Sequence, residues 1–170
     1  MKPQIMFLMQ MGLGYLAWLL CLDAYLLPKF REIGPLRALR AIAFLNAFRY
    51  LGMVIILPGV VGPGLPPDFG PDAAFGDLLT ALLAILALLT WRSRPLFLFL
   101  TLAFNAVGVV DLLVDYFHAI RGGLPEVSGQ LGGVYWVPVI YVPLLMITHI
   151  LSFRLLMQVK TEAAATGADA

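Results

Sequence analysis

The sequence contains little charge, and this shortage limits what the protein can be. Only 12% of its 170 residues are Asp, Glu, Lys or Arg, whereas soluble domains carry about 25%. Hydrophobic residues make up 61% of the chain, and the mean hydropathy is +0.92. Too few solvated side chains remain to cover a surface that faces water, so part of the surface must face lipid. The composition therefore predicts an integral membrane protein whose main partner is the lipid bilayer.

Cysteine is almost absent as well. The single cysteine, Cys21, lies in an apolar run, which excludes an internal disulfide and a cysteine-based metal site. We interpret it as a small buried hydrophobic side chain. The formal net charge of +1 provides no bulk attraction to nucleic acid, so we expect no nucleic-acid partner. The sequence also has no Gly-x-Ser-x-Gly run and no plausible Cys–His pair, so an enzymatic role stays open but is less favoured than a non-enzymatic one.

Five apolar stretches dominate the chain, and each is near the ~20 residues that a helix needs to cross a bilayer. The segments between them are rich in proline, glycine and charge, which is typical of helix ends and loops. The first stretch is too long for a signal peptide and lacks a small-residue cleavage site, so we interpret it as a retained helix. The stretches are 5–27, 41–62, 73–91, 95–118 and 134–157.

These stretches predict an all-α fold, a bundle of five transmembrane helices that forms one domain over residues 1–160. Residues 161–170 are small and polar, and we expect a flexible cytoplasmic tail there. Pro138 and Pro143 remove two backbone donors from the last stretch, so its first half should be irregular. In a membrane, neighbouring helices or water must satisfy the carbonyl groups that these prolines leave free.

The basic residues predict the orientation of the bundle. Eight of them lie at one set of helix ends, and the opposite ends have only two. The positive-inside rule then places the N-terminus outside and the C-terminus in the cytoplasm. The eight are Lys29, Arg31, Arg37, Arg40, Arg92, Arg94, Arg154 and Lys160, the two are Lys2 and Arg121, and the second loop instead has Asp68 and Asp72.

Polar and small residues recur along one face of the stretch 95–118. Their spacing of three or four residues keeps them within roughly a 140° arc of a helix. Polar groups inside a span are costly and face protein or a cavity more often than lipid. We therefore expect a polar pocket on this side of the helix, formed by Thr101, Asn105, Gly108, Asp111, Asp115 and His118.

The depth of each polar residue follows from counting along its predicted helix at ~1.5 Å per residue. An inner layer and an outer layer result, and Arg49 can reach between them to pair with Asp111 or Asp23. The charged and hydrogen-bonding groups together predict a site for a small solute or a proton. The inner layer is Asp23, Asn46, Arg49, Asn105 and His149, and the outer layer is Asp77, Asp111, Asp115 and His118.

Other interpretations of the same residues stay open. Asn46, Asn105 and Thr101 are also explained by hydrogen bonds that only hold helices together. Asp111, Asp115 and His118, at positions i, i+4 and i+7, are a weak candidate metal site, because carboxylate and imidazole suit zinc or iron. Haem is disfavoured because His118 and His149 lie at different depths, and we expect no cofactor.

Several local strings resemble small uncharacterised multi-pass membrane proteins of bacteria. The resemblance spans about 45–155. It implies a location in the bacterial cytoplasmic membrane and no particular activity. The strings are Phe48-Arg49, Leu57-Pro58-Gly59-Val60-Val61, Gly76-Asp77-Leu78, Asn105 with Asp111-Leu112-Leu113, and Val142-Pro143-Leu144-Leu145 with Thr148-His149.

We therefore expect a small membrane protein that binds or passes a small solute or a proton. The alternatives are a structural subunit that docks another membrane protein or its own copy, and an enzyme for a lipid-soluble substrate that uses Asp111 or Asp115 as acid or base. A pocket requires the polar face to lie inside the bundle, whereas a docking subunit requires it on the outside.

Overall fold

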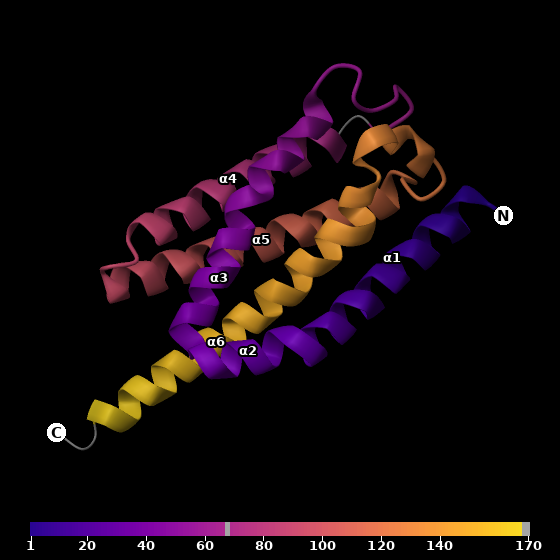
Figure 1. The fold of residues 1–170 in the computed structure, drawn as a ribbon. Coiled ribbons are helices and arrows are strands. Elements are labelled where there is room, and N and C mark those ends of the chain that lie inside the picture. Colours follow the sequence, from indigo (N-terminus) through magenta and orange to yellow (C-terminus); the bar gives the residue numbers. More distant parts are fainter. Residues whose placement is uncertain (67–68, 168–170) are drawn as a thin grey trace.

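The computed structural model describes residues 1–66 and 69–167, and this part of the chain contains helices and no strand. Five helical segments are long and apolar enough to cross a membrane, which confirms the predicted all-α class. The first of these segments starts at the opposite end of the bundle from where the last one ends (Figure 1), as an odd number of segments with alternating direction requires. The five segments are 3–33, 35–56, 70–89, 94–121 and 137–162.

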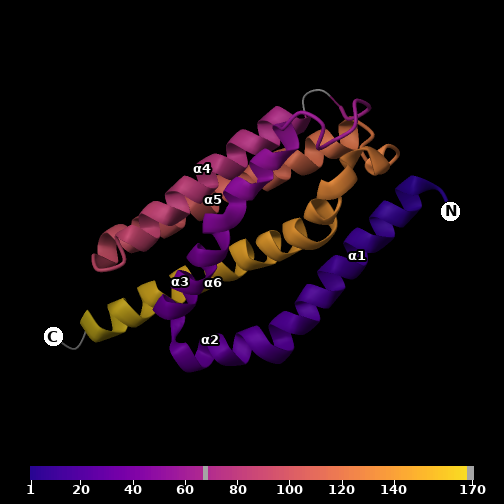
Figure 2. The same cartoon turned by 45° about the horizontal axis from the view of Figure 1, so that its top comes forward.

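The first two segments meet at a sharp corner where the sequence predicts a loop over 28–37. Helix α1 (Pro3–Cys21) continues through the π-helical turn η1 (Leu22–Leu26) into α2 (Leu27–Ile33). Pro28 is accepted because it lies in the first turn of α2, where its missing N–H is not needed. The helix ends only at Gly34, whose φ of +81° suits glycine, and Pro35 starts the next helix. Figure 2 shows the bend from α2 into α3 at this corner.

The second segment changes its helical type halfway. It begins as α3 (Pro35–Ala47) and continues as the 3₁₀-helix η2 (Phe48–Ile56), so it ends before the predicted boundary at residue 62. Glycine and β-branched residues disfavour an α-helix in its second half, and Pro58 restricts the residue before it. Because a 3₁₀-helix has three residues per turn, Arg49, Gly52 and Ile55 form one row along η2.

The remaining segments complete the bundle. Helix α4 (Phe69–Leu89) and helix α5 (Arg94–Arg121) are joined by a tight turn and pack extensively on each other. The chain then passes through the 3₁₀-helix η3 (Ser128–Val134) and the π-helical turn η4 (Val137–Tyr141) into α6 (Val142–Gly167). The structure thus has an irregular stretch where Pro138 and Pro143 predict one.

The predicted flexible tail differs from the structure over most of its length. Helix α6 continues to Gly167, so residues 161–167 are helical. The three consecutive alanines at 163–165 explain the continuation, since alanine has the highest helix propensity. Residues 168–170 of that tail, and Asp68 of the second loop, lie outside the described residues.

The bundle has two ends of different construction. At the end with the α4–α5 turn, which we call the tight end, buried side chains from α3, α4, α5 and α6 form one apolar core. At the end with residues 57–66 and 122–136, which we call the loop end, a smaller core forms beneath irregular segments. The tight-end core is Ala38, Leu39, Ile42, Ala43, Ala84, Ala87, Phe97, Phe104, Leu151, Leu155 and Val159, and the loop-end core is Phe7, Leu124, Leu131, Val134 and Val139.

Helix α1 lies along the outside of the bundle, and Phe7 is its only buried residue. Polar contacts attach it to the loop end. The Trp18 indole N–H donates to the carbonyl of Ile140 at 2.9 Å, and a Cβ at Gly14 would overlap the carbonyl of Val139. That carbonyl is one of those that Pro143 leaves without a helical donor. Glycine and indole on α1 therefore accommodate the irregular backbone of η4.

Candidate functional site

The side chain of Arg49 is fully buried where η2, α4, α5 and α6 meet. Its Nε donates to Asp77 Oδ1 at 2.7 Å, and its Nη2 lies 2.6 Å from the same oxygen and 2.5 Å from Asp111 Oδ2. Its Nη1 donates to the carbonyl of Gly108 and to His149 Nε2, both at 3.3 Å. A guanidinium has five N–H groups, and these five contacts use all of them.

A chain of hydrogen bonds continues from Arg49 toward the tight end. Asn105 Nδ2 donates to the carbonyl of Thr101 at 2.6 Å, which orients its amide oxygen toward His149. That oxygen lies 2.8 Å from His149 Nδ1, and because an amide oxygen only accepts, Nδ1 must hold the proton. The lone pair of His149 Nε2 is then free to accept from Arg49. The imidazole is therefore neutral and links Asn105 to the guanidinium.

Three glycines make the space that the ion pairs occupy. A Cβ at Gly76 would overlap Asp111 Oδ1, and a Cβ at Gly52 would overlap Asp77 Oδ2. A Cβ at Gly108 would lie 2.6 Å from His149 Nε2 and 2.7 Å from Arg49 Nη1. Each of these three glycines thus presents bare backbone to a member of the network, and larger residues at these positions would separate the charges.

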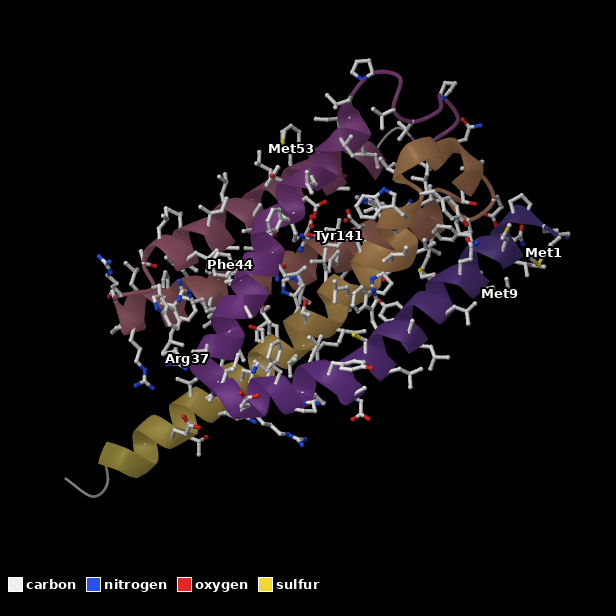
Figure 3. The ribbon with its side chains drawn as sticks, viewed as in Figure 1. Met1, Met9, Arg37, Phe44, Met53 and Tyr141 are labelled. Atoms are coloured by element: carbon white, nitrogen blue, oxygen red, sulfur yellow. The ribbon has the colours of Figure 1, made fainter. Side chains whose placement is uncertain are left out.

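An apolar cavity of about 140 Å³ lies beside this network at the loop end. Most of its wall is hydrophobic, and α1 closes one side with Phe7, Leu8 and Met11. Four polar side chains face it, which are Asp77, Asp115, Tyr116 and Tyr141. Figure 3 shows Tyr141 in the middle of the bundle, where its hydroxyl donates to the carbonyl of Leu45 at 3.3 Å. The cavity therefore combines an oily wall with a small number of polar groups, as ligand sites generally do.

The charges next to the cavity do not balance. Arg49 is the one cation of the network, and both Asp77 and Asp111 contact it. Asp115 faces the cavity one helical turn beyond Asp111, and it takes part in none of the hydrogen bonds or ion pairs formed among the described residues. Two carboxylates already share the guanidinium, so the third has no counter-charge in contact with it in the described part of the chain.

The structure sorts the predicted site residues into three groups. Arg49, Asp77, Asp111, Asn105 and His149 form the network, and only Asp77 of these also faces the cavity. Asp115 faces the cavity without joining the network. Asn46, His118 and Asp23 belong to neither.

The last group lies apart from the network and the cavity, although the sequence predicts its members as part of the same site. Asn46 is buried, but its Nδ2 donates to the carbonyl of Ile42 in its own helix at 3.0 Å. His118 Nδ1 lies 3.3 Å from Asp72 Oδ2. Asp23 is exposed in η1 and does not contact Arg49. The second carboxylate that Arg49 contacts, beside Asp111, is that of Asp77. The reason is packing: η2 lies against α4, whereas α1 is on the outside.

The polar face of α5 is turned inward, as a pocket requires. Thr101, Asn105 and Gly108 are buried, while Phe99, Val110 and Ile120 on the other side are 61–75% exposed. The weak metal candidate is not assembled, because no group of three His, Cys, Asp or Glu side chains among the described residues could hold an ion. With Asp72 beside it, His118 forms a contact at the end of the helix instead.

Sequence reasoning missed the glycines Gly52 and Gly76 and the phenols Tyr116 and Tyr141. Gly76 directly precedes Asp77, and Gly52 is three residues from Arg49, so both are neighbours of charged residues in an apolar span. A glycine in that position is a usable signal of close approach. For the tyrosines the sequence contains no such signal, since their role depends on which helices meet.

Comparison with known proteins adds a family and no activity. Residues 6–157 match the family described as "Domain of unknown function (DUF8737)", which is most of the chain and includes every residue of the network and the four polar side chains of the cavity. No curated protein and no solved structure matches the chain.

Proposed function

We propose that this chain, which belongs to the DUF8737 family, is a multi-pass membrane protein that binds a small lipid-soluble molecule in the loop-end cavity. Asp77 and Asp115 would hold the polar group of the ligand, and the apolar wall would hold the rest. The Arg49 network behind the cavity would keep Asp77 in place. The observation that carries the proposal is a partly open apolar cavity lined by the Asp115 carboxylate, which has no hydrogen-bond or ion-pair partner among the described residues.

The size of the cavity limits the ligand. Its volume of about 140 Å³ is similar to the roughly 150 Å³ of an engineered apolar cavity in another protein that binds benzene. A ligand of about that size fits, for example one aromatic ring or a short alkyl chain with one polar group. Such molecules partition into lipid, so they reach a site between membrane helices without crossing water.

The charge at the cavity selects the polar group. Two carboxylates contact the one guanidinium and a third, Asp115, does not, and an unpaired carboxylate in a low-dielectric site attracts a cation or takes up a proton. The favoured ligand therefore has an amine or another positively charged group. Asp115 would lose a proton when the ligand binds and regain one when the ligand leaves. One site would then serve both the small solute and the proton that the sequence predicts.

The membrane location and the orientation belong to the same proposal. The resemblance of several strings to membrane proteins of bacteria supports a bacterial cytoplasmic membrane, and the positive-inside rule supports an N-terminus on the outside. The basic residues of the first and third predicted loops lie around the tight end, so this end would face the cytoplasm and the cavity would lie in the outer half of the bilayer. The ligand would then enter from the outer leaflet or from the outside.

The test is the binding of small probes to the purified protein in detergent, measured by calorimetry. We expect benzylamine to bind and its uncharged analogue benzyl alcohol to bind at least about tenfold more weakly, since the loss of one ion pair in a buried site costs more than 1.4 kcal/mol. Asp115→Asn should remove this preference. Ala119→Leu should fill the cavity and abolish binding of both probes, because Ala119 is part of the wall.

A matched control is Ala106→Leu, the same change on the exposed side of the same helix. It should bind benzylamine as the unchanged protein does. If neither probe binds, or if Ala119→Leu binds as well as Ala106→Leu, the cavity is not a ligand site and the proposal is wrong.

A second candidate is a structural subunit, and the exposure of α1 supports it. Only 6% of the most apolar part of the first segment is buried, against 33–50% in the other four. A partner helix or a second copy would cover this face. Crosslinking through a cysteine at exposed Leu13, with Cys21 replaced by alanine, tests the second-copy form, and a dimer in native membranes would favour it.

A further inference from the structure

A second feature, at the tight end of the bundle, has no role in the proposed function. A shallow cleft opens there between the first turns of α3 and the α4–α5 turn. Two arginines and two aromatic rings form it, on a scaffold that the tight-end core holds in place. Its lining is Arg37, Arg40, Ala41, Phe44 and Trp91.

The guanidinium of Arg40 is stacked in this cleft. Its Cζ lies 4.6 Å from the centre of the Trp91 ring and 5.6 Å from that of Phe44. Trp91 in turn packs edge-on against Phe97, with ring centres 4.9 Å apart, and Phe97 is fully buried in the tight-end core. The arginine is thus held by a rigid aromatic surface, and stacking of this kind fixes the plane of the guanidinium.

Arg40 has donor capacity that the protein does not use. Its Nε is buried and has no hydrogen-bond partner among the described residues. A buried donor without an acceptor costs stability unless a bound group supplies the acceptor. The exposed guanidinium of Arg37 lies in the same cleft, one turn of α3 earlier. Two forked donors that share one cleft match the oxygens of a phosphate.

The charge around the cleft has one sign. Arg92 and Arg94 follow Trp91 directly and are exposed, and neither α3 nor the α4–α5 turn contains Asp or Glu. The first acidic residue of α5 is Asp111, about 25 Å along the helix from Arg94 at 1.5 Å per residue. Arg92 and Arg94 would therefore attract an anion in the cleft, and no acidic residue of α3 or of the α4–α5 turn would repel it.

The surface next to the cleft is shaped for acyl chains. Phe44, Phe48 and Leu51 follow one another at steps of four and three residues, so they lie on one face of the second segment. Their exposed fractions are 49–53%. Figure 3 shows Arg37 at the tight end and Phe44 farther along the same segment. A basic cleft at the end of a membrane-spanning helix, continued by an apolar exposed face, matches the headgroup and tail of one lipid.

We infer that this cleft is a binding site for the phosphate of an anionic phospholipid, with Arg37 and Arg40 on the phosphate and the acyl chains along Phe44, Phe48 and Leu51. Basic residues at the end of a membrane-spanning segment lie at the depth of the headgroups, where anionic lipids attract them. The phosphate oxygens would accept from the terminal N–H groups of Arg37 and Arg40, which form no hydrogen bond among the described residues. The cleft opens at the tight end and the cavity lies at the loop end, and no residue lines both.

The test is a titration of the delipidated protein in detergent with phosphatidylglycerol or with phosphatidylcholine, followed by native mass spectrometry. We expect phosphatidylglycerol to bind more tightly, and the double variant Arg37→Gln/Arg40→Gln to lose most of that preference, at about fivefold for each arginine. Arg40→Lys keeps the charge but loses the stacked fork, so it should lose about as much of the preference as Arg40→Gln. Circular dichroism and gel filtration identify the folded variants that enter the comparison.

Arg121→Gln is the matched control, because Arg121 is also stacked on an aromatic ring, Phe117, but lies at the loop end. It should bind phosphatidylglycerol as the unchanged protein does. If Arg40→Lys binds like the unchanged protein, or Arg121→Gln weakens binding equally, only general charge attraction acts and the inference is wrong. If inorganic phosphate displaces the lipid at equal concentration, the site is for a soluble phosphate compound and the lipid assignment is overturned.

Discussion

The tight end and the loop end of the same bundle are stabilised in different ways. At the tight end, alanines such as Ala84 and Ala87 let helices approach closely, and Leu39, Phe97 and Phe104 fill the space without polar groups. At the loop end, four of the five buried core residues line a cavity beneath 3₁₀- and π-helical segments. Between the two lies the ion-pair network of Arg49, whose partners come from α4, α5 and α6.

For the membrane location that we propose, this difference follows from lipid as the solvent. Helices in lipid gain little from hiding apolar surface, so their association depends on close packing and interhelical hydrogen bonds. The tight end is held together by close packing, and the Arg49 network is held together by interhelical hydrogen bonds. Irregular backbone is tolerated only where protein or a cavity satisfies it, and the loop end provides both. Function that needs an open space and free polar groups is therefore expected at the loop end.

The largest effect should come from Arg49→Met. It leaves Asp77 and Asp111 buried and facing each other without the guanidinium, and breaking one side of a buried ion pair costs about 3–5 kcal/mol. The free energy of unfolding, measured by titration with sodium dodecyl sulfate in detergent, should fall by that amount. The triple variant Arg49→Met/Asp77→Asn/Asp111→Asn removes all three charges and should regain more than half of the loss.

Leu39→Ala is the comparison at the tight end. It should cost a similar free energy, roughly 2–5 kcal/mol, because it leaves a hole in a packed core. It should not change benzylamine binding. If the triple variant is as unstable as Arg49→Met alone, the network is not held together by its charges and the contrast between the two ends is lost.

An intermediate effect is expected for Gly76→Ala. The added Cβ would overlap the Asp111 carboxylate, and overpacking of this kind typically costs 1–3 kcal/mol. Gly12→Ala is the matched control on α1, because a Cβ there meets nothing within 4 Å. It should leave stability unchanged or raise it by up to about 1 kcal/mol. The same titration measures both, and equal results for the two glycines would contradict the described approach of α4 to α5.

The smallest effect should come from Tyr15→Phe. The hydroxyls of Tyr15 and Tyr116 are 2.6 Å apart, and this contact is one of those that hold α1 against the cavity. Its loss should cost about 0.5–1.5 kcal/mol. Since α1 closes the cavity, we expect faster dissociation of benzylamine in a stopped-flow measurement, with little change in the fold. An unchanged dissociation rate would show that the ligand does not pass α1.

Much of the fold was accessible from local patterns, whereas the site was accessible only in part. The lengths of the apolar stretches located five helices, but the helix ends differ from the predicted ones. The first segment continues past residue 27 to Ile33, the second ends at Ile56 before residue 62, and the last continues past residue 160 to Gly167. Proline, glycine and alanine near a helix end decide where it stops, and apolar length does not report them. The spacing along α5 identified Asn105, Gly108 and Asp111, since a helix face is a local property. The structure does not bring Asp23 to Arg49, because depth along a helix does not say which helices touch.

The sequence alone determined that the chain is apolar enough for a bilayer, that five segments are long enough to cross it, and that α5 has one polar side. Each of these is a property of a single segment, set by composition and by helical period. Only the tertiary structure decided that Arg49 pairs with Asp77 as well as Asp111, that Gly52 and Gly76 make room for the carboxylates, and that an apolar cavity lies beside Asp115. Those features depend on which helices meet and at what distance, and the packing of segments far apart in the chain sets both.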